Sequence, residues 1–255
     1  MWIEHGRTRT RGQAMVETLV IVFITLLLLL GVIQFGLIYN AKTNLNYATF
    51  EAARAGALNY ADRRAIEFGL ARGLAPLYTS IDVADSTQDN IGAVQSARDR
   101  VLQEIDDGEF VCIERVNPTV AAFDGHGVEV PLGSGKLFEG EKLIPNDHLL
   151  YRSRRLKADL TIQDANLLKL RVTYCYPMIV PIVSTAIQRL TGTTADSASD
   201  IAVGQSAGGP TYGSVTPAGS FQQNCYAEGR MPIVAQSIVR MQTPARNDIF
   251  PLSCN

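Results

Sequence analysis

The sequence is poor in the residues from which most enzyme sites are built. It has three histidines in 255 residues, and no H-E-x-x-H, G-x-S-x-G or P-loop pattern occurs. His126 and His148 each stand alone, which is more typical of loop or surface residues than of metal ligands or catalytic bases. We therefore expect no catalytic residue, no metal and no cofactor, and a protein that is not an enzyme.

Charge and cysteine are also scarce. Charged residues make up 19% of the chain and the net charge is −2, so we expect no basic surface for nucleic acid. Four cysteines in a chain of this length are too few to form a disulfide scaffold by themselves. A mean hydropathy of +0.05 excludes a protein with many membrane spans, so any lipid-facing segment must be concentrated in one place.

That place is the segment Thr18–Ala41, which holds 24 residues without a charge. As a helix it would be about 36 Å long, which exceeds the ~30 Å hydrocarbon core of a bilayer. Arg7, Arg9 and Arg11 precede it, and Lys42 is the first charge after it. By the positive-inside rule, the N-terminus lies in the cytoplasm and the rest of the chain lies outside.

Three interpretations of this segment compete. A cleaved signal peptide would have an apolar region of about 7–15 residues and a small-x-small cleavage site, and neither is present. An uncleaved anchor explains the length but not Glu17, a carboxylate at the entrance of the apolar helix. Cleavage after Gly12 would place the new ammonium of Gln13 one helical turn from Glu17. A neighbouring subunit could provide the same ammonium, or Glu17 could simply mark the membrane interface.

The stretches Arg11–Glu17, Gln34–Gly36 and Phe50–Gly56, with the apolar run between them, resemble the TadE-like family. These are minor pseudopilins of the bacterial tight-adherence (Tad, type IVc) pilus. Two later stretches, Leu167–Pro181 and Met231–Pro244, resemble parts of larger family members. The resemblance covers about a third of the chain and leaves the middle unrecognised.

The resemblance implies a leader, Met1–Gly12, that a prepilin peptidase removes between Gly12 and Gln13. Glu17 would align the subunit against the N-terminus of a neighbour. The implied partners are the prepilin peptidase, other pilins and minor pseudopilins, the inner-membrane pilus assembly platform and the lipid bilayer. The implied location is the bacterial inner membrane, with the C-terminal domain in the periplasm, and the extracellular pilus after assembly.

The hydrophobic periodicity predicts one long helix over residues 13–57, with its membrane span at about 18–41. Its small residues would serve either filament packing or the core of an external domain. Residues 58–255 would form that periplasmic α+β domain, with a flexible segment at 191–220. Inside it we expect a loop at 119–147, helices at 60–74 (ended by Pro76) and 90–107, and strands at 110–116, 167–176 and 231–241. Helices first and strands later predict a pilin-like α+β fold, in which the long helix lies across an antiparallel sheet.

All four cysteines, Cys112, Cys175, Cys225 and Cys254, follow the predicted span. An even count on the periplasmic side favours two disulfides, for which three connectivities exist. Because Cys112 and Cys175 lie in the two clearest strands, we favour that pair, with Cys225 bonded to Cys254.

The function that these features indicate is that of a minor pseudopilin. It would be needed for the assembly, priming or tip of a Tad pilus that acts in adhesion and surface attachment. The alternative is a single-span, inner-membrane-anchored periplasmic binding protein outside any pilus system. That alternative has the same topology but gives Gly12 and Glu17 no role.

Overall fold

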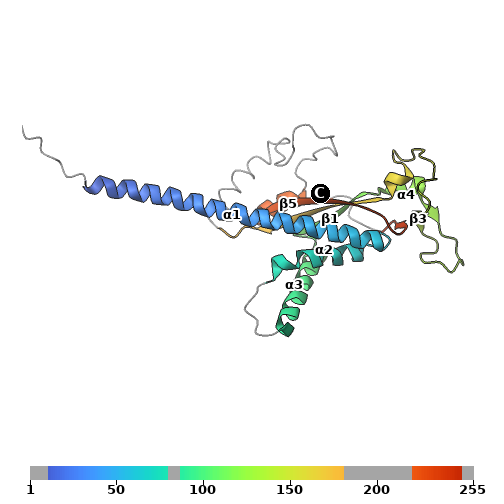
Figure 1. Cartoon of the computed structure of the whole chain (residues 1–255), viewed down its shortest axis with the longest axis horizontal. Coiled ribbons are helices and arrows are strands. Elements are labelled where there is room, and N and C mark those ends of the chain that lie inside the picture. Colours follow the sequence, from blue (N-terminus) through green and yellow to red (C-terminus); the bar gives the residue numbers. More distant parts are fainter. Residues whose placement is uncertain (1–10, 80–86, 181–219, 249–255) are drawn as a thin grey trace, which may run out of the picture.

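The computed structural model describes residues 11–79, 87–180 and 220–248. A single long helix, α1 (Arg11–Leu58), extends out of a mixed helix and sheet domain (Figure 1). The α+β class is therefore confirmed. The flexible segment expected at 191–220 lies outside the described residues, except for Ser220, at which helix α7 (Ser220–Ala227) begins.

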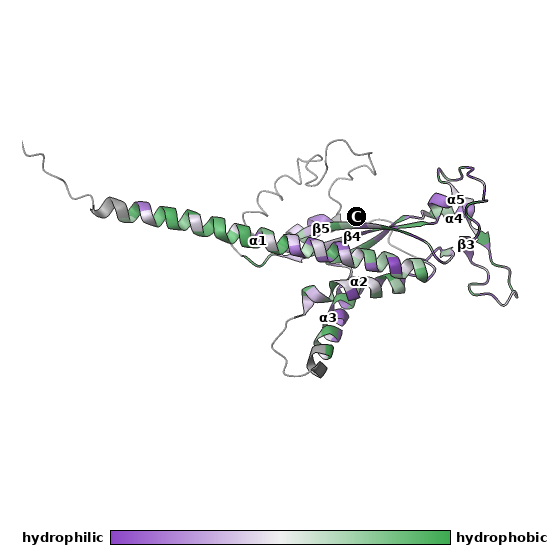
Figure 2. Cartoon of the chain, viewed as in Figure 1, coloured by the Kyte–Doolittle hydropathy of each residue, from purple (hydrophilic) through white to green (hydrophobic). Residues whose placement is uncertain are grey.

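Helix α1 has two halves with different surroundings. From Met15 to Ile33 its side chains are exposed or half-exposed on every face, and most of them are apolar (Figure 2). From Ala41 onward one face is buried, and its residues recur at the three- and four-residue steps of an amphipathic helix: Ala41, Leu45, Ala48, Ala52 and Ala53, Ala57. The long helix predicted for residues 13–57 is thus confirmed to within two residues at each end.

The buried half of α1 packs on a three-stranded antiparallel sheet in the order β1 (Val111–Asn117), β4 (Leu167–Pro177), β5 (Arg230–Arg240). Strand β4 is central and pairs with β5 along its whole length, from Leu167 opposite Arg240 to Pro177 opposite Arg230. It is buried at most positions from Leu168 to Tyr176, since α1 covers one face of the sheet and α7 packs against Cys175 on the other. The three predicted strands and the predicted crossing of the long helix are confirmed.

Helix α2 (Arg63–Tyr78) runs along α1 at very short range. A Cβ atom added to Gly73 would lie 2.6 Å from the Cβ of Ala48, and one added to Gly69 would lie 2.9 Å from the Cα of Ala52. The two glycines, four residues apart on α2, therefore face the small residues of α1. Here the small residues serve the packing of the domain itself.

The predicted ends of the other helices are partly wrong. Pro76 does not stop α2, because in the last turn it removes only one intrahelical hydrogen bond. The helix ends two residues later, where the N–H and the hydroxyl of Thr79 both donate to the carbonyl oxygen of Ala75. Helix α3 (Thr87–Asp107) packs on α2 and ends as predicted, at Gly108 with a φ of 69°.

The loop predicted for residues 119–147 is wrong in part. It contains α4 (Val120–His126) and two short strands, β2 (Val128–Glu129) and β3 (Lys142–Ile144). Strand β3 also pairs with β6 (Ala245–Arg246), which lies far from it in the sequence. Strands of two or three residues have too little alternation to be seen in a sequence. A short helix, α5 (Ile162–Ala165), precedes β4.

Two tyrosines, the buried Tyr174 and the partly buried Tyr78, join α2 to the sheet. The hydroxyl of Tyr78 on α2 donates to Glu104 on α3, and its ring centroid lies 6.3 Å from that of Tyr174 on β4. Burial raises the pKa of Tyr174 to about 12 and raises the pKa of Tyr78 as well. Because burial favours the neutral phenol, both groups stabilise the fold fully only below the pKa of an unfolded tyrosine, about 10.

We expect the free energy of unfolding to fall between pH 10 and pH 12 by about 2 kcal/mol from Tyr174 alone. In the Tyr174→Phe variant this fall should be smaller, because the phenol that would have to ionise is gone. The measurement is urea unfolding of the full chain in detergent at several pH values. Tyr151→Phe, which changes an exposed ring, is the control. Equal slopes in all three proteins would contradict this role of Tyr174.

Candidate functional site

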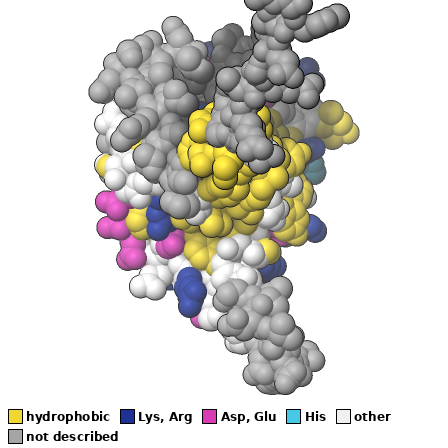
Figure 3. Space-filling model, turned by 90° about the vertical axis from the view of Figure 1, so that its left-hand side faces the viewer, with side chains coloured by type: hydrophobic (Ala, Val, Ile, Leu, Met, Phe, Trp, Pro, Cys, Tyr) yellow, Lys and Arg dark blue, Asp and Glu magenta, His cyan; other side chains and the backbone are white. Residues whose placement is uncertain are grey.

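We call the exposed half of α1, residues 15–33, the apolar arm. Figure 3 views the molecule from the end at which α1 begins, and apolar side chains gather there. Large apolar residues with about half or more of their surface exposed cover the arm on all sides: Met15, Val16, Leu19, Val20, Ile21, Val22, Phe23, Ile24, Leu26, Leu28, Leu29, Val32, Ile33. In water such a surface would be strongly unfavourable, so the arm requires lipid or other apolar helices around it.

The residues predicted for processing lie just before this arm, and the residue predicted for alignment lies near its start. Gly12 and Gln13 belong to the first turn of α1, and Glu17 follows about one turn later with an exposed side chain. Glu17 lies about 26 Å along the helix from Gln34, where the domain first covers α1. Among the residues that the structure describes, the domain therefore first covers α1 well beyond Glu17.

Gln34 marks the junction between the arm and the domain. Its side chain is fully buried, and its Oε1 accepts a hydrogen bond of 3.0 Å from the backbone N–H of Val180. Two turns further on, the Nζ of Lys42 donates to the carbonyl oxygen of Val234 on β5. In the sequence, Gln34 is noted only as part of a stretch that resembles the TadE-like family. Neither its burial nor its contact with Val180 could be predicted, because both depend on a segment far away in the chain.

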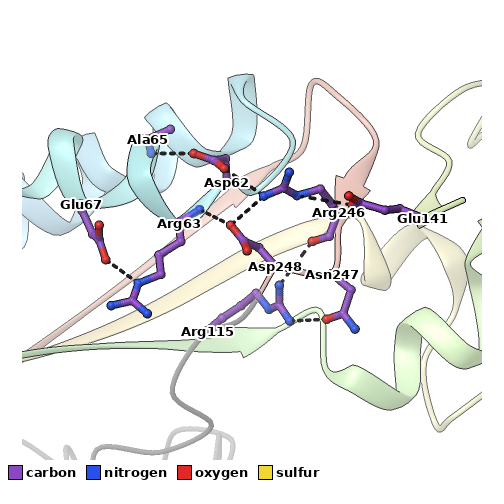
Figure 4. A network of polar contacts seen from close by, with 9 residues as sticks. All are labelled: Asp62, Arg63, Ala65, Glu67, Arg115, Glu141, Arg246, Asn247 and Asp248. Atoms are coloured by element: carbon purple, nitrogen blue, oxygen red, sulfur yellow. Dashed lines mark hydrogen bonds and ion pairs between the residues drawn. The ribbon is translucent and has the colours of Figure 1, made fainter. Parts of the chain in front are cut away.

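A second group of polar residues lies at the other end of the domain (Figure 4). Arg246 on β6 is its centre: its Nη2 lies 3.1 Å from Asp62 Oδ1 and 3.0 Å from Asp248 Oδ2, and its Nε lies 3.7 Å from Glu141. Asp248 also accepts a hydrogen bond from the backbone N–H of Arg63. The contacts connect β6 to the start of α2 and to β3, so this network holds the small sheet against the helices.

Arg115 on β1 extends the same network. Its Nη2 donates to Asn247 Oδ1 at 2.9 Å, and its guanidinium stacks on the ring of Phe123. Burial lowers the pKa of Arg115 to about 10, and the nearby Asp248 opposes the shift. Each charged group named here has an ion-pair or hydrogen-bond partner within the network, which is typical of a structural cluster.

His126 and a glycine-rich turn, Gly133–Lys136, also have structural partners. His126 is buried at the end of α4 rather than on the surface, and its Nε2 lies 2.9 Å from the carbonyl oxygen of Leu160. In the turn at Gly133–Lys136, the Glu139 carboxylate accepts hydrogen bonds from the N–H groups of Gly133 and Gly135, which lower its pKa. Within residues 11–79, 87–180 and 220–248, no group of three or more His, Cys, Asp or Glu side chains is arranged to hold a metal.

The favoured disulfide pairing is wrong. Cys175 bonds Cys225 on α7, with the two Cα atoms 5.3 Å apart, and Cys112 is also disulfide-bonded. The register explains the outcome: Cys112 lies opposite Thr173, so Cys175 is its diagonal neighbour, too distant for easy bridging. Helix α7, which the sequence did not reveal, brings Cys225 over the sheet. Cys254 lies outside the described residues.

These features define a class of protein: an α+β domain carried by a long N-terminal helix whose first half is apolar on all sides. Among the described residues this is the one helix that is long and apolar enough to cross a membrane, which is consistent with a single-pass membrane anchor.

Comparison with known families makes the assignment more specific. Residues 12–54 match the model of the TadE-like protein family, so this segment of the chain is TadE-like. The match starts at Gly12 and covers nearly all of α1. A TadE-like segment indicates a protein associated with the Tad pilus system. No curated protein and no solved structure matches the chain.

Proposed function

We propose that the chain is a minor pseudopilin, needed for the assembly, priming or tip of a Tad pilus that acts in adhesion and surface attachment. The observation that carries this proposal is the TadE-like match at residues 12–54, which begins at the residue where the leader would be cut. The match also includes Glu17 and the whole apolar arm. An ordinary anchored binding protein would need neither the glycine nor the glutamate.

In this proposal the protein works by association and not by catalysis. The arginines before the arm keep the N-terminus in the cytoplasm, and the domain stands in the periplasm. The apolar arm first lies in the inner membrane and then buries its surface among equivalent helices of other pilins. Its exposure on all sides suits both surroundings.

Glu17 gives this association its register. A carboxylate this close to the hydrocarbon region is costly unless a cation pairs with it. Removal of the leader by the prepilin peptidase would create such a cation, the ammonium of Gln13, on every subunit. Pairing between Glu17 and the ammonium of a neighbour would align the two helices, and the assembly platform would then take up the aligned subunits.

The position of the mature N-terminus tests the proposal. Mass spectrometry of protein purified from its native membrane should show a chain that begins at Gln13. Replacement of Gly12 by valine should abolish cleavage, because a branched side chain at the cut site blocks the peptidase. Gly6→Val, which makes the same change inside the leader, should be cleaved as the wild type is.

A wild-type chain that begins before Gln13 would overturn the leader assignment. The anchored periplasmic binding protein would then be the better account of the same topology. Cleavage that continues unchanged in the Gly12→Val variant would equally contradict the assignment of Gly12.

A further inference from the structure

A basic and apolar loop lies at the end of the domain farthest from the apolar arm. This segment, which we call the distal loop, comprises residues 147–157 and connects β3 to α5, on the right of Figure 1. Its large apolar side chains point into solvent: Leu150, Tyr151 and Leu156 have 80%, 85% and 65% of their surface exposed. Three such residues within seven positions form an unusual surface for a loop.

The domain holds this loop in a fixed shape. Leu149 is buried beneath it, and the Nε2 of Gln163 donates to the carbonyl oxygens of Leu149 and Arg152 at 2.8 and 3.1 Å. Arg152 in turn forms an ion pair of 2.8 Å with Asp147. The exposure of the apolar side chains is therefore a property of an ordered surface, ready to bind without further ordering.

The loop also carries unpaired positive charge. Arg154, Arg155 and Lys157 are exposed, and none of them has an ion pair within the part of the chain that the structure describes. The chain as a whole has a net charge of −2, so the loop is opposite in sign to the rest of the chain. A complementary partner must present acidic side chains next to apolar ones.

Helix α3 of the same chain presents such a surface. Ile91, Asp99, Leu102 and Asp106 are spaced by eight, three and four residues, which places them on one flank of the helix. Ile91 is half-exposed, Leu102 is partly buried, and both aspartates are exposed. We call these four residues the α3 flank.

The acids of the α3 flank are poorly compensated. Among the described residues, Asp99 has one ion pair, at 3.4 Å with its exposed neighbour Arg98, and Asp106 has none. Asp106 lies in the last turn of α3, which has no basic residue, and there the helix dipole disfavours an anion. A cationic partner would stabilise both aspartates.

We propose that the distal loop of one copy binds the α3 flank of a second copy. Within one chain the two surfaces lie apart, because α3 projects from the side of the domain and the loop lies at its far end (Figure 1). The contact joins two different surfaces, so a pair of copies still has one free distal loop and one free α3 flank. Further copies can therefore add to the pair in the same way. It goes beyond the proposed function and requires neither cleavage at Gly12 nor a pilus.

Charge reversal in the full chain tests this contact. The variants are Arg154→Glu/Arg155→Glu in the loop and Asp99→Lys/Asp106→Lys in the α3 flank. In detergent micelles, sedimentation velocity should show that each variant alone associates at least about tenfold more weakly than the wild type, because like charges now meet. Raising the salt concentration should weaken association of the wild type.

Mixing the two variants provides the decisive measurement. Each variant keeps the surface that the other has lost, so an equimolar mixture should regain association close to that of the wild type. The matched controls are Arg64→Glu/Arg72→Glu on exposed positions of α2 and Glu129→Lys/Glu228→Lys on other exposed positions. They make the same changes in net charge and should associate as the wild type does.

Four results would overturn the proposal. The first is unchanged association of either reversed variant, and the second is a mixture that associates no better than its components although both are folded by circular dichroism. The third is association equally weakened by the control variants, which would indicate a general effect of charge. Wild-type chains that do not associate at all, but bind anionic vesicles or DNA through Arg154 and Arg155, would also count against a second copy as the partner.

Discussion

Replacing Gly73 with valine is expected to destabilise the domain by about 3 kcal/mol, the upper end of the cost of overpacking a core. Even a single Cβ at this position would lie 2.6 Å from the Cβ of Ala48 and closer still to its backbone. The obstacle is the backbone of α1 itself, which cannot rotate away as a side chain can. To make room, α2 would have to move off α1 along the length of their contact.

The measurement is urea unfolding of the full chain in detergent, followed by circular dichroism. Gly92→Ala is the matched control, because Gly92 lies inside α3 with nothing within 4 Å of an added Cβ. That change should leave stability unchanged or raise it by up to about 1 kcal/mol, as alanine is the better helix former. Similar stabilities of Gly73→Val and the wild type would show that α1 and α2 are not packed as described.

The largest loss of stability is expected from removal of the disulfide between Cys175 and Cys225. The bond joins residues 50 positions apart, and a closed loop of that length contributes about 4 kcal/mol in the chain-entropy model. Both cysteines are fully buried between β4 and α7. The Cys175→Ala/Cys225→Ala variant should therefore unfold at a much lower urea concentration than the oxidised wild type.

The single variant Cys225→Ala separates two contributions to stability, that of the disulfide bond and that of the packing of the two cysteine side chains. Because either change breaks the same bond, the single variant should lose nearly as much stability as the double variant. If the single variant instead stays within about 1 kcal/mol of the wild type, the disulfide contributes little and the fold of α7 depends on other contacts.

Both predictions concern features that lie beyond the TadE-like segment or at its end. The family match stops at residue 54, so it covers α1 but neither α2 nor the sheet. The close packing of Gly69 and Gly73 against α1 couples the TadE-like helix to α2, and the contacts of α1 with β4 and β5 couple it to the sheet. Loss of that packing would leave α1 attached to the domain only through its contacts with the sheet.

Much of the architecture could be predicted because its signals are local and long. The uncharged run before Lys42 and the regular spacing of alanines after it define α1 without reference to any other part of the chain. Strands β4 and β5 each have eleven residues, enough for β-branched and aromatic residues to outweigh helix formers. The glycine after Asp107 likewise marks the end of α3 by its own conformational freedom.

Other features depend on pairs of residues far apart in sequence, and the structure alone determined them. The disulfide of Cys175 depends on where α7 lies, the short strand β3 depends on β6, and Arg246 finds Asp62 across 184 positions. From the sequence, the small residues of α1 could serve either filament packing or the core of the domain. The structure shows α2 packed against them. A local pattern records which face of an element is apolar, but it does not record what covers that face, because the partner is brought there by the rest of the chain.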